Sequence, residues 1–261
     1  MGLKHIMRDI ETSWDKLEVF CNQITQTSLA TVVPYVQRFS IGVPSSWGEW
    51  HRTQMLGEII GACTNLRRLE LALSGSSRWL RYLPPNAHVE ELVLRGSSSN
   101  SKPVLFDLND LHMFRSVRVL KLEFVNLTRD YSSAAPSPVL FDTVTELSIF
   151  NCHWDFPFTL STFRAVRVLN ACYTLKCESF TFSERLRSLA SRPPATLRRL
   201  TLHLNLLSPQ RHKTWYPELE GCPELEFVSL KGFRYPGIDY FNRMPRTLRI
   251  VDLSYEAFPG A

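Results

Sequence analysis

Cysteine and histidine are the residues of this chain whose spacing comes closest to a chemical site. Cys152 stands beside His153, and four residues separate Cys172 from Cys177. A structural zinc site needs two such close pairs, and the sequence offers no second one. Cys172 also falls on an expected strand, where a thiol usually fills the core. The spacing therefore predicts reduced core thiols, with no metal and no cofactor.

Catalytic motifs are absent from the sequence as well. The seven histidines are scattered, and His203 and His212 flank a loop without an HExxH context. The 11 glycines form no G-x-S-x-G turn, no dinucleotide-binding loop and no phosphate-binding loop. We predict that the chain is not an enzyme and has no catalytic residues. A serine–histidine–aspartate triad stays open as an alternative, because it is defined in space.

Arginine recurs at one position of a repeated pattern, directly after the apolar residue that begins it. The residues are Arg67, Arg118, Arg167, Arg198 and Arg249. Stacked strands lie about 4.8 Å apart, so these side chains would form a basic rim along one edge of a sheet. Such a rim could bind acidic peptides or phosphates. Glu90 and Glu226 favour the alternative of a solvated rim that pairs with its own neighbours.

The pattern that carries these arginines is apolar-x-x-apolar-x-apolar. Its nine copies begin at residues 36, 66, 89, 117, 144, 166, 197, 225 and 248. Leucine-rich repeats have a similar core and run roughly 20–29 residues. The fourth and sixth positions share one face of a short strand, which stacking would bury. We predict an α/β, leucine-rich-repeat-like solenoid of about nine irregular repeats, with a curved parallel sheet and helices or loops on its convex side.

The residue after each strand departs from the usual repeat. An asparagine or cysteine there would hydrogen-bond the backbone of the turn, and only Cys152 and Asn205 fit clearly. Other copies place Ser74, Ser97 or Val125 near this point. We therefore expect irregular turns.

The third, fifth and seventh positions of each copy should face away from the core, on the concave side. They mix charged and apolar residues, which suits a protein-binding surface with apolar anchors among polar groups. The residues that we expect to bind a partner are Arg68, Glu91, Val93, Val119, Lys121, Glu146, Phe150, Arg199, His203 and Phe227. The alternative is that loops of the same chain cover them.

Helical patterns lie between the expected strands. Residues 49–66 place apolar side chains at a 3–4 spacing, and 108–114 and 183–194 are shorter versions. Residues 158–165 and 239–244 suit single turns. Residues 13–24 place Trp14, Leu17 and Cys21 on one face, with Ser13 as the expected N-cap. We predict residues 1–35 as an N-terminal strand/helix cap over the end of the stack, and residues 36–261 as one continuous solenoid.

Composition and charge suit a cytoplasmic or nuclear protein. Apolar residues make up 44% of the 261 residues, enough for a sizeable core. The net charge of +5 is too small to argue for nucleic acid by itself. The N-terminal segment carries charges throughout and is no signal peptide, and no window of about 18 apolar residues exists. We expect no membrane partner.

The pattern resembles leucine-rich-repeat proteins of the ribonuclease-inhibitor-like kind, and looks most like F-box/leucine-rich-repeat proteins of mushroom-forming fungi. The segments that carry the resemblance are "SWDKLEVF" (13–20), "VVPYVQRFSI" (32–41), "CTNLRRLEL" (63–71), "VTELSIFNCHW" (144–154) and "ATLRRLTL" (195–202). In that family an F-box with an "LPxE"-like start comes first and docks onto the adaptor of a cullin-type ubiquitin ligase, and the repeats hold the substrate. The sequence contains no such start, so the resemblance implies a member that lacks its F-box.

The sequence and this resemblance together predict a non-enzymatic protein–protein interaction module, similar to a ubiquitin-ligase substrate receptor without its F-box. We do not expect the ligase adaptor to bind this chain directly. Phosphate or nucleic-acid binding through the arginine rim is the alternative, with nucleic acid the less favoured of the two. A truncated product without independent function is a second alternative.

Overall fold

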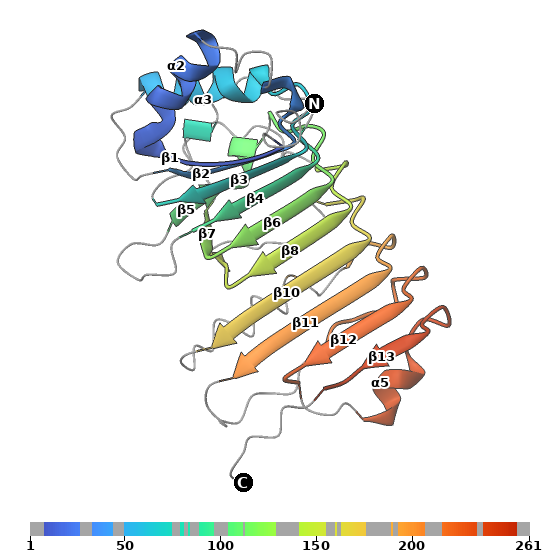
Figure 1. The fold of residues 1–261 in the computed structure, drawn as a ribbon. Helices are drawn as coiled ribbons and strands as arrows, with labels where there is room; N and C mark the ends of the chain where they lie inside the picture. The colour runs from blue at the N-terminus through green and yellow to red at the C-terminus, as the bar shows by residue number, and fades with distance from the viewer. Residues whose placement is uncertain are drawn as a thin grey trace, which may run out of the picture. The chain divides into compact units, whose positions relative to one another are not determined.

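The computed structural model divides the chain into two compact units, residues 1–139 and 140–261 (Figure 1). It describes residues 8–26, 33–43, 50–74, 79–80, 83, 89–96, 104–111, 113–128, 141–154, 160, 163–175, 189, 193–206, 216–233 and 237–254. In both units, short parallel strands alternate with turns or helices that return the chain to the start of the next strand.

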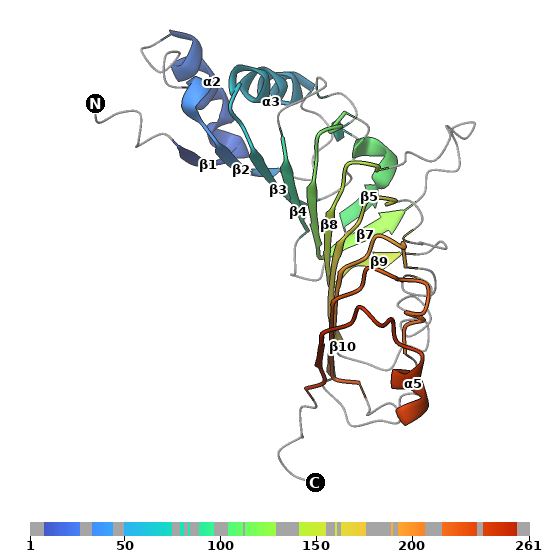
Figure 2. The same cartoon turned by 90° about the vertical axis from the view of Figure 1, so that its right-hand side faces the viewer.

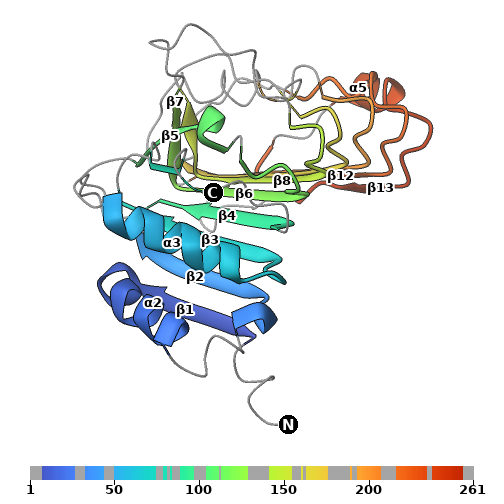
Figure 3. The same cartoon turned by 90° about the horizontal axis from the view of Figure 1, so that it is seen from above.

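The strands of the first unit run in the order β1-β2-β3-β4-β6, and each adjacent pair is parallel. Their bounds are β1 (Asp9–Ser13), β2 (Arg38–Val43), β3 (Arg68–Leu73), β4 (Glu91–Arg95) and β6 (Val119–Glu123). A separate parallel pair joins β5 (Val104–Asp107) to β7 (Val125–Thr128). The connections include η1 (Trp14–Lys16), α2 (Leu17–Gln26), η3 (Val33–Tyr35), α3 (Trp50–Ala62) and η5 (Leu108–Leu111). Figure 3 shows α2 and α3 side by side next to the first strands.

The strands of the second unit run in the order β8-β10-β11-β12-β13, again with parallel neighbours. Their bounds are β8 (Glu146–Phe150), β10 (Val168–Leu175), β11 (Arg199–Leu206), β12 (Phe227–Lys231) and β13 (Ile250–Asp252). The unit also contains β9 (His153–Trp154) and the short helix α5 (Ile238–Asn242). Figure 2 shows α5 set off to one side of the strands of this unit.

The repeated pattern places its apolar positions in the core of each unit. At the fourth position, Phe39, Leu69, Leu92 and Leu120 of the first unit are at most 1% exposed. Leu147, Leu169, Leu200 and Val228 of the second unit are equally buried. The register aligns these residues across neighbouring strands, so each layer of the core is shared between copies. All nine predicted copies supply a strand, and the predicted leucine-rich-repeat-like architecture is confirmed.

One further copy precedes the nine, and the sequence pattern missed it. Strand β1 pairs with β2 so that Ile10 stands opposite Phe39 and Thr12 opposite Ile41. The carbonyl of Arg8 accepts hydrogen bonds from the N–H groups of Gln37 and Arg38, as the carbonyl of Arg67 does from Glu90 and Glu91. The repeated pattern requires an apolar residue at the sixth position, and this copy has the polar Thr12 there, so a search with the pattern does not find it.

The two N-terminal helices largely follow the prediction. Trp14, Leu17 and Cys21 are buried, and α2 packs against α3, whose Leu56 and Ile59 are at most 1% exposed. Ser13 is confirmed as an N-cap residue, at the start of η1, and its side chain makes no hydrogen bond to the helix. Whether α2 covers the end of a stack stays a prediction.

The shorter predicted helices differ from the structure. Residues 108–114 form only the single turn η5, after an Asp107 carboxylate that accepts the N–H of Asn109 at 2.8 Å. This local bond closes a tight turn in place of an extended helix. The predicted turn at 239–244 is confirmed as α5. Half of the segment 158–165 and most of the segment 183–194 lie outside the described residues.

The last described strand differs from the others in burial. Val251 occupies the fourth position of β13 and is 39% exposed, whereas the same position is buried in β12. Strand β13 ends the strand order, so Val251 has a paired strand on one side only. Separately, no helix in the described part of the chain has the length and hydropathy to cross a membrane.

Candidate protein-binding face

The third, fifth and seventh positions form aligned rows on the side of each sheet away from the core. In the second unit, the row of third positions joins Glu146, Val168, Arg199, Phe227 and Ile250. In the first unit, the same row joins Arg38, Arg68, Glu91 and Val119. We call these rows the open face of the first unit and the open face of the second unit. All ten residues that we expected to bind a partner stand in them.

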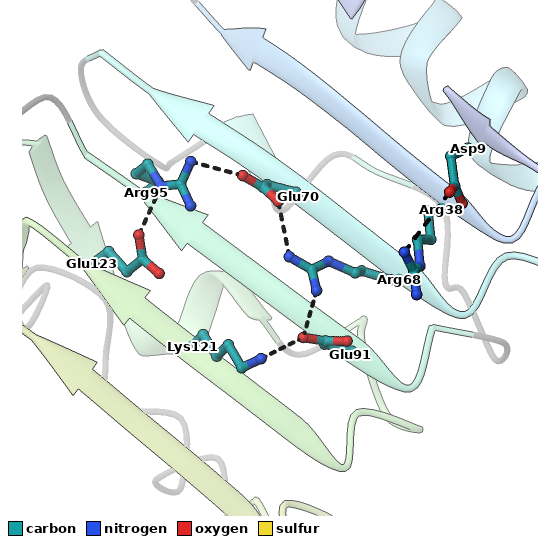
Figure 4. A network of polar contacts seen from close by, with 8 residues as sticks. All are labelled: Asp9, Arg38, Arg68, Glu70, Glu91, Arg95, Lys121 and Glu123. Carbon is teal, nitrogen blue, oxygen red and sulfur yellow. Dashed lines mark hydrogen bonds and ion pairs between the residues drawn. The ribbon is translucent and has the colours of Figure 1, made fainter. Parts of the chain in front are cut away.

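The open face of the first unit is a network of ion pairs (Figure 4). The Glu91 carboxylate lies 3.2 Å from Nη1 of Arg68 and 2.7 Å from Nζ of Lys121. The Glu70 carboxylate lies 3.1 Å from Arg68 and 3.0 Å from Arg95. Each of these contacts joins residues of the same or neighbouring strands, so the strand spacing itself brings the opposite charges together.

The network continues to Glu123 of β6, and a separate ion pair joins β1 to β2. Glu123 accepts a hydrogen bond from Nε of Arg95 at 2.7 Å, which raises the pKa of that guanidinium. Arg38 and Asp9 form a looser pair at 3.8 Å, with both side chains more than half exposed. Every arginine and lysine at the described third, fifth and seventh positions of this unit therefore has a carboxylate of its own face.

Val93 corrects the predicted binding surface. It occupies the fifth position of β4 but is only 1% exposed. Its neighbours in the row are Glu70 and Lys121, whose long side chains reach across the strand to their ion-pair partners. The network covers the small valine side chain, so Val93 offers no surface to a partner.

The open face of the second unit is mostly uncharged. Its row of fifth positions holds Ser148, Asn170, Thr201, Ser229 and Asp252. Asn170 donates to the Ser148 hydroxyl at 3.4 Å, and Ser229 donates to Asp252 at 2.9 Å. Apolar side chains flank this row, since Phe150, Val168 and Phe227 are partly exposed and Ile250 is 56% exposed.

The cations of this second face are held differently from those of the first. Nζ of Lys231 lies 3.9 Å from Asp252, at the limit of an ion pair. The guanidinium carbon of Arg199 lies 5.2 Å from the centre of the Phe227 ring, which is a cation–π contact. Arg199 forms no ion pair with the described residues.

Cys172 and His203 stand opposite each other in the row of seventh positions, the closest approach to a catalytic pair. Burial raises the pKa of the Cys172 thiol, which favours the protonated form rather than a nucleophilic thiolate. Nε2 of His203 is buried without a hydrogen-bond partner. In the described part of the chain, no group of three or more histidine, cysteine or acidic residues could hold a metal ion.

The backbone register aligns the arginine rim, and an acidic residue separates Arg67 from Arg118 and Arg198 from Arg249, whereas Arg167 and Arg198 are direct neighbours. In the first unit, Arg67 and Arg118 flank Glu90 through successive backbone hydrogen bonds. In the second unit, the order is Arg167, Arg198, Glu226 and Arg249, and Arg198 donates to the Glu224 carboxylate at 2.9 Å. Alternating charge of this kind reduces the attraction of the rim for an extended anion.

The turns that set the register of these rows use side chains that the sequence analysis did not single out. Asn65, Thr196 and Thr247 each directly precede the first position of a copy. The Thr247 hydroxyl donates to the carbonyls of Pro223 (2.8 Å) and Leu225 (2.9 Å) in the previous copy. Thr196 and Asn65 make similar bonds, to the carbonyl of Val166 at 2.9 Å and to that of Pro34 at 2.6 Å. In the sequence, these turns are marked by an asparagine or threonine directly before the apolar first position of a copy.

The predicted turn residues after the strands are confirmed only in part. The Cys152 thiol is buried and donates to the carbonyl of Phe150 at 3.4 Å. The backbone of Asn205 lies inside β11, opposite Thr174 of β10, and its predicted side-chain bond stays a prediction. The long strands β10 and β11 continue past the point where the other copies turn.

A solved structure is similar to this chain over most of its length. The crystal structure of internalin C2 from Listeria monocytogenes covers 91% of this chain and 92% of its own, with 17% sequence identity and a TM-score of 0.44. No protein-family model matches the chain, and no curated protein matches it. The fold assignment therefore rests on the strand register and the burial of the repeated positions.

Proposed function

We propose that this chain is a non-enzymatic protein-binding module whose contact surface is the open face of the second unit. The observation that carries the proposal is the contrast between partly exposed apolar side chains on this face and internally paired charges on the other. Phe150, Val168, Phe227 and Ile250 are arranged among small uncharged polar groups. Apolar anchors with polar surroundings are the residues that usually dominate binding energy at protein interfaces.

The aromatic anchors are also restrained before any partner arrives. Phe227 is only partly exposed and lies against Arg199. A side chain that is already oriented loses less conformational entropy on binding, so more of its apolar contact appears as affinity. The ion pairs of the first face act in the opposite direction, because a partner would have to desolvate charges that are already satisfied.

The same face would also serve the more specific role of a substrate receptor. In a substrate receptor of the F-box/leucine-rich-repeat kind, the open face of the second unit would hold the substrate. Phosphate or nucleic-acid binding by the arginine rim is less favoured, because Glu90 and Glu226 alternate with its arginines and Glu224 occupies Arg198.

The test is selection of binders from a displayed library of random peptides on the full 261-residue chain. We expect the selected peptides to lose affinity by about tenfold or more for Phe150→Ala and Phe227→Ala, as expected for interface hot spots. Thermal unfolding of both variants serves as the folding control, with Leu200→Ala as the core reference. Val119→Ala, at the third position in the first unit, should leave the affinity unchanged.

Two results would contradict the proposal. One is a failure of binding at this face: either no peptide is selected, or the affinity of the selected peptides falls only for substitutions on the rim or on the first face. The other is that Phe150→Ala and Phe227→Ala unfold the chain as severely as Leu200→Ala, which would place the two rings in the core.

A further inference from the structure

We propose that Arg199 is the specificity-determining residue of this face, and that it binds the side-chain carboxylate of an aspartate or glutamate that lies next to an apolar residue of the partner. The inference rests on the proposed function. It adds the chemistry of the partner: an acidic–apolar segment in place of an unspecified protein surface.

Arg199 differs from every other arginine and lysine at the described open-face positions. Arg38, Arg68, Arg95 and Lys121 each have a carboxylate within 4 Å, and Lys231 has Asp252 at 3.9 Å. Among the residues that the structure describes, the contact of Arg199 is with the face of the Phe227 ring, at 5.2 Å. The fold therefore orients its positive charge, and no described carboxylate pairs with it.

The surroundings of Arg199 fit an acidic residue with an apolar neighbour. In its row, Arg199 stands between Val168 and Phe227, and Ile250 follows Phe227. A guanidinium held over a ring keeps N–H donors that can pair with the two oxygens of a carboxylate. A carboxylate bound there would place the adjoining partner residues over Val168 or Ile250.

In the part of the chain that the structure describes, the acidic residues near Arg199 are distant or already engaged. Glu146 stands in the same row but beyond the intervening strand β10, about 9–10 Å away along the sheet. Asp252 accepts a hydrogen bond from Ser229 and faces Lys231. Glu224 is held by Arg198, and Glu226 stands in the rim between Arg198 and Arg249.

The experiment repeats the peptide selection on two proteins, the unchanged chain and Arg199→Glu. We expect peptides from the unchanged chain to share an aspartate or glutamate beside an aromatic or aliphatic residue. Peptides from Arg199→Glu should lose the acidic position and gain lysine or arginine there, because the substitution reverses the charge at one point of the face. Thermal unfolding confirms that Arg199→Glu is folded.

Synthetic peptides with an amidated C-terminus then give the size of the effect and exclude binding through a terminal carboxylate. Replacing the acidic residue by its amide should weaken binding by about tenfold, and Arg199→Gln should weaken it similarly. The two changes together should cost little more than either alone, since both remove the same contact. Arg95→Gln, on the first face, is the matched control and should have no effect.

The outcomes separate this inference from the proposed function. Peptides that depend on Phe227 but carry no acidic residue, or that bind Arg199→Gln with undiminished affinity, would overturn the role of Arg199 and leave the protein-binding face in place. Selection of the same acidic peptides by Arg199→Glu would overturn it as well. Failure to select any peptide would count against the proposed function itself.

Discussion

The open faces of the two units are built on the same kind of strand scaffold. They differ in whether their side chains are paired within the face or available to a partner. In both units the fourth and sixth positions fill the core, and the third, fifth and seventh positions form rows. In the first unit these rows contain Glu91, Glu70 and the cations with which they form ion pairs. The second unit fills them with Phe150, Phe227 and small polar groups. The difference shows that the strand pattern builds a surface, whereas pairing within the surface decides what remains for a partner.

Both faces rest on equivalent cores, so substitutions in either core should cause the largest losses of stability. Leu69→Ala in the first unit and Leu147→Ala or Leu200→Ala in the second should each lower the free energy of unfolding by about 2–5 kcal/mol, because each removes a core layer shared by neighbouring copies. Chemical denaturation measures the loss. Ser148→Ala, on the open face, is the control, and an equal loss for this control would break the repeat assignment.

Two glycines at the same position of their copies should also behave alike. Gly96 and Gly232 each follow the seventh position, and a Cβ atom there would overlap the backbone carbonyl of Phe124 or Leu204. Gly232 in addition has φ +77°, in the left-handed region. We expect Gly96→Ala and Gly232→Ala to destabilise the chain by about 1–3 kcal/mol in thermal or chemical unfolding.

The control for these glycine substitutions is Gly221→Ala, because a Cβ atom at Gly221 meets nothing within 4 Å. It should be neutral or slightly stabilising. A loss at Gly221 as large as that at Gly232 would mean that the close backbone approach is not what requires glycine there.

The core sides of the units should also respond alike to alkaline pH. Burial raises the pKa of Cys63 to about 12 and that of Cys222 to about 11, from an ordinary value of 9.0. Above pH 9 the unfolded thiols ionise while the folded ones keep their protons, so stability is lost as the pH rises from about 9 toward 11–12. Denaturation curves between pH 8 and 10 should show this fall.

Removing one thiol tests its share of the pH dependence. Cys63→Ala and Cys222→Ala should each reduce the slope above pH 9 by up to about 1.4 kcal/mol per pH unit. Their slopes should match that of the unchanged chain below pH 8. An unchanged slope above pH 9 in both variants would show that these thiols are not shielded from water in the folded state.

The smallest expected effect is the loss of stability when an open-face glutamate is neutralised, and it should differ between the two faces. Glu91→Gln removes the shared partner of Arg68 and Lys121 and should cost about 0.5–1 kcal/mol at low salt, with a smaller loss at high salt. Glu146→Gln, at the same position of β8, should cost close to nothing because Glu146 forms no ion pair with the described residues. Equal costs for the two substitutions would remove the electrostatic difference between the faces.

The sequence predicts the scaffold well because burial at the fourth and sixth positions repeats the same local physics in each copy. It misses β1 because Thr12 stands where the template requires an apolar residue. It also misses the turn bonds of Asn65 and Thr247, which join one copy to the previous one.

The candidate face is predicted less completely, for a physical reason. The pattern places Glu91, Arg68 and Lys121 in adjacent rows, but only the packing of their long side chains shows that they pair and that they cover Val93. The same limit applies to Arg199, because only the placement of the described neighbours shows that none of their carboxylates pairs with it. Residue types therefore predict which positions face outward, while the structure decides which of them are still free to bind.

The most direct measurement uses two valines at the same position of their copies, Val119 on the first face and Val168 on the second. Both are partly exposed third positions. Each is replaced in turn by photoreactive benzoylphenylalanine, and the chain is irradiated with a peptide selected on the unchanged protein. We expect cross-links from position 168 and none from position 119. Cross-links from position 119 with none from position 168 would contradict it.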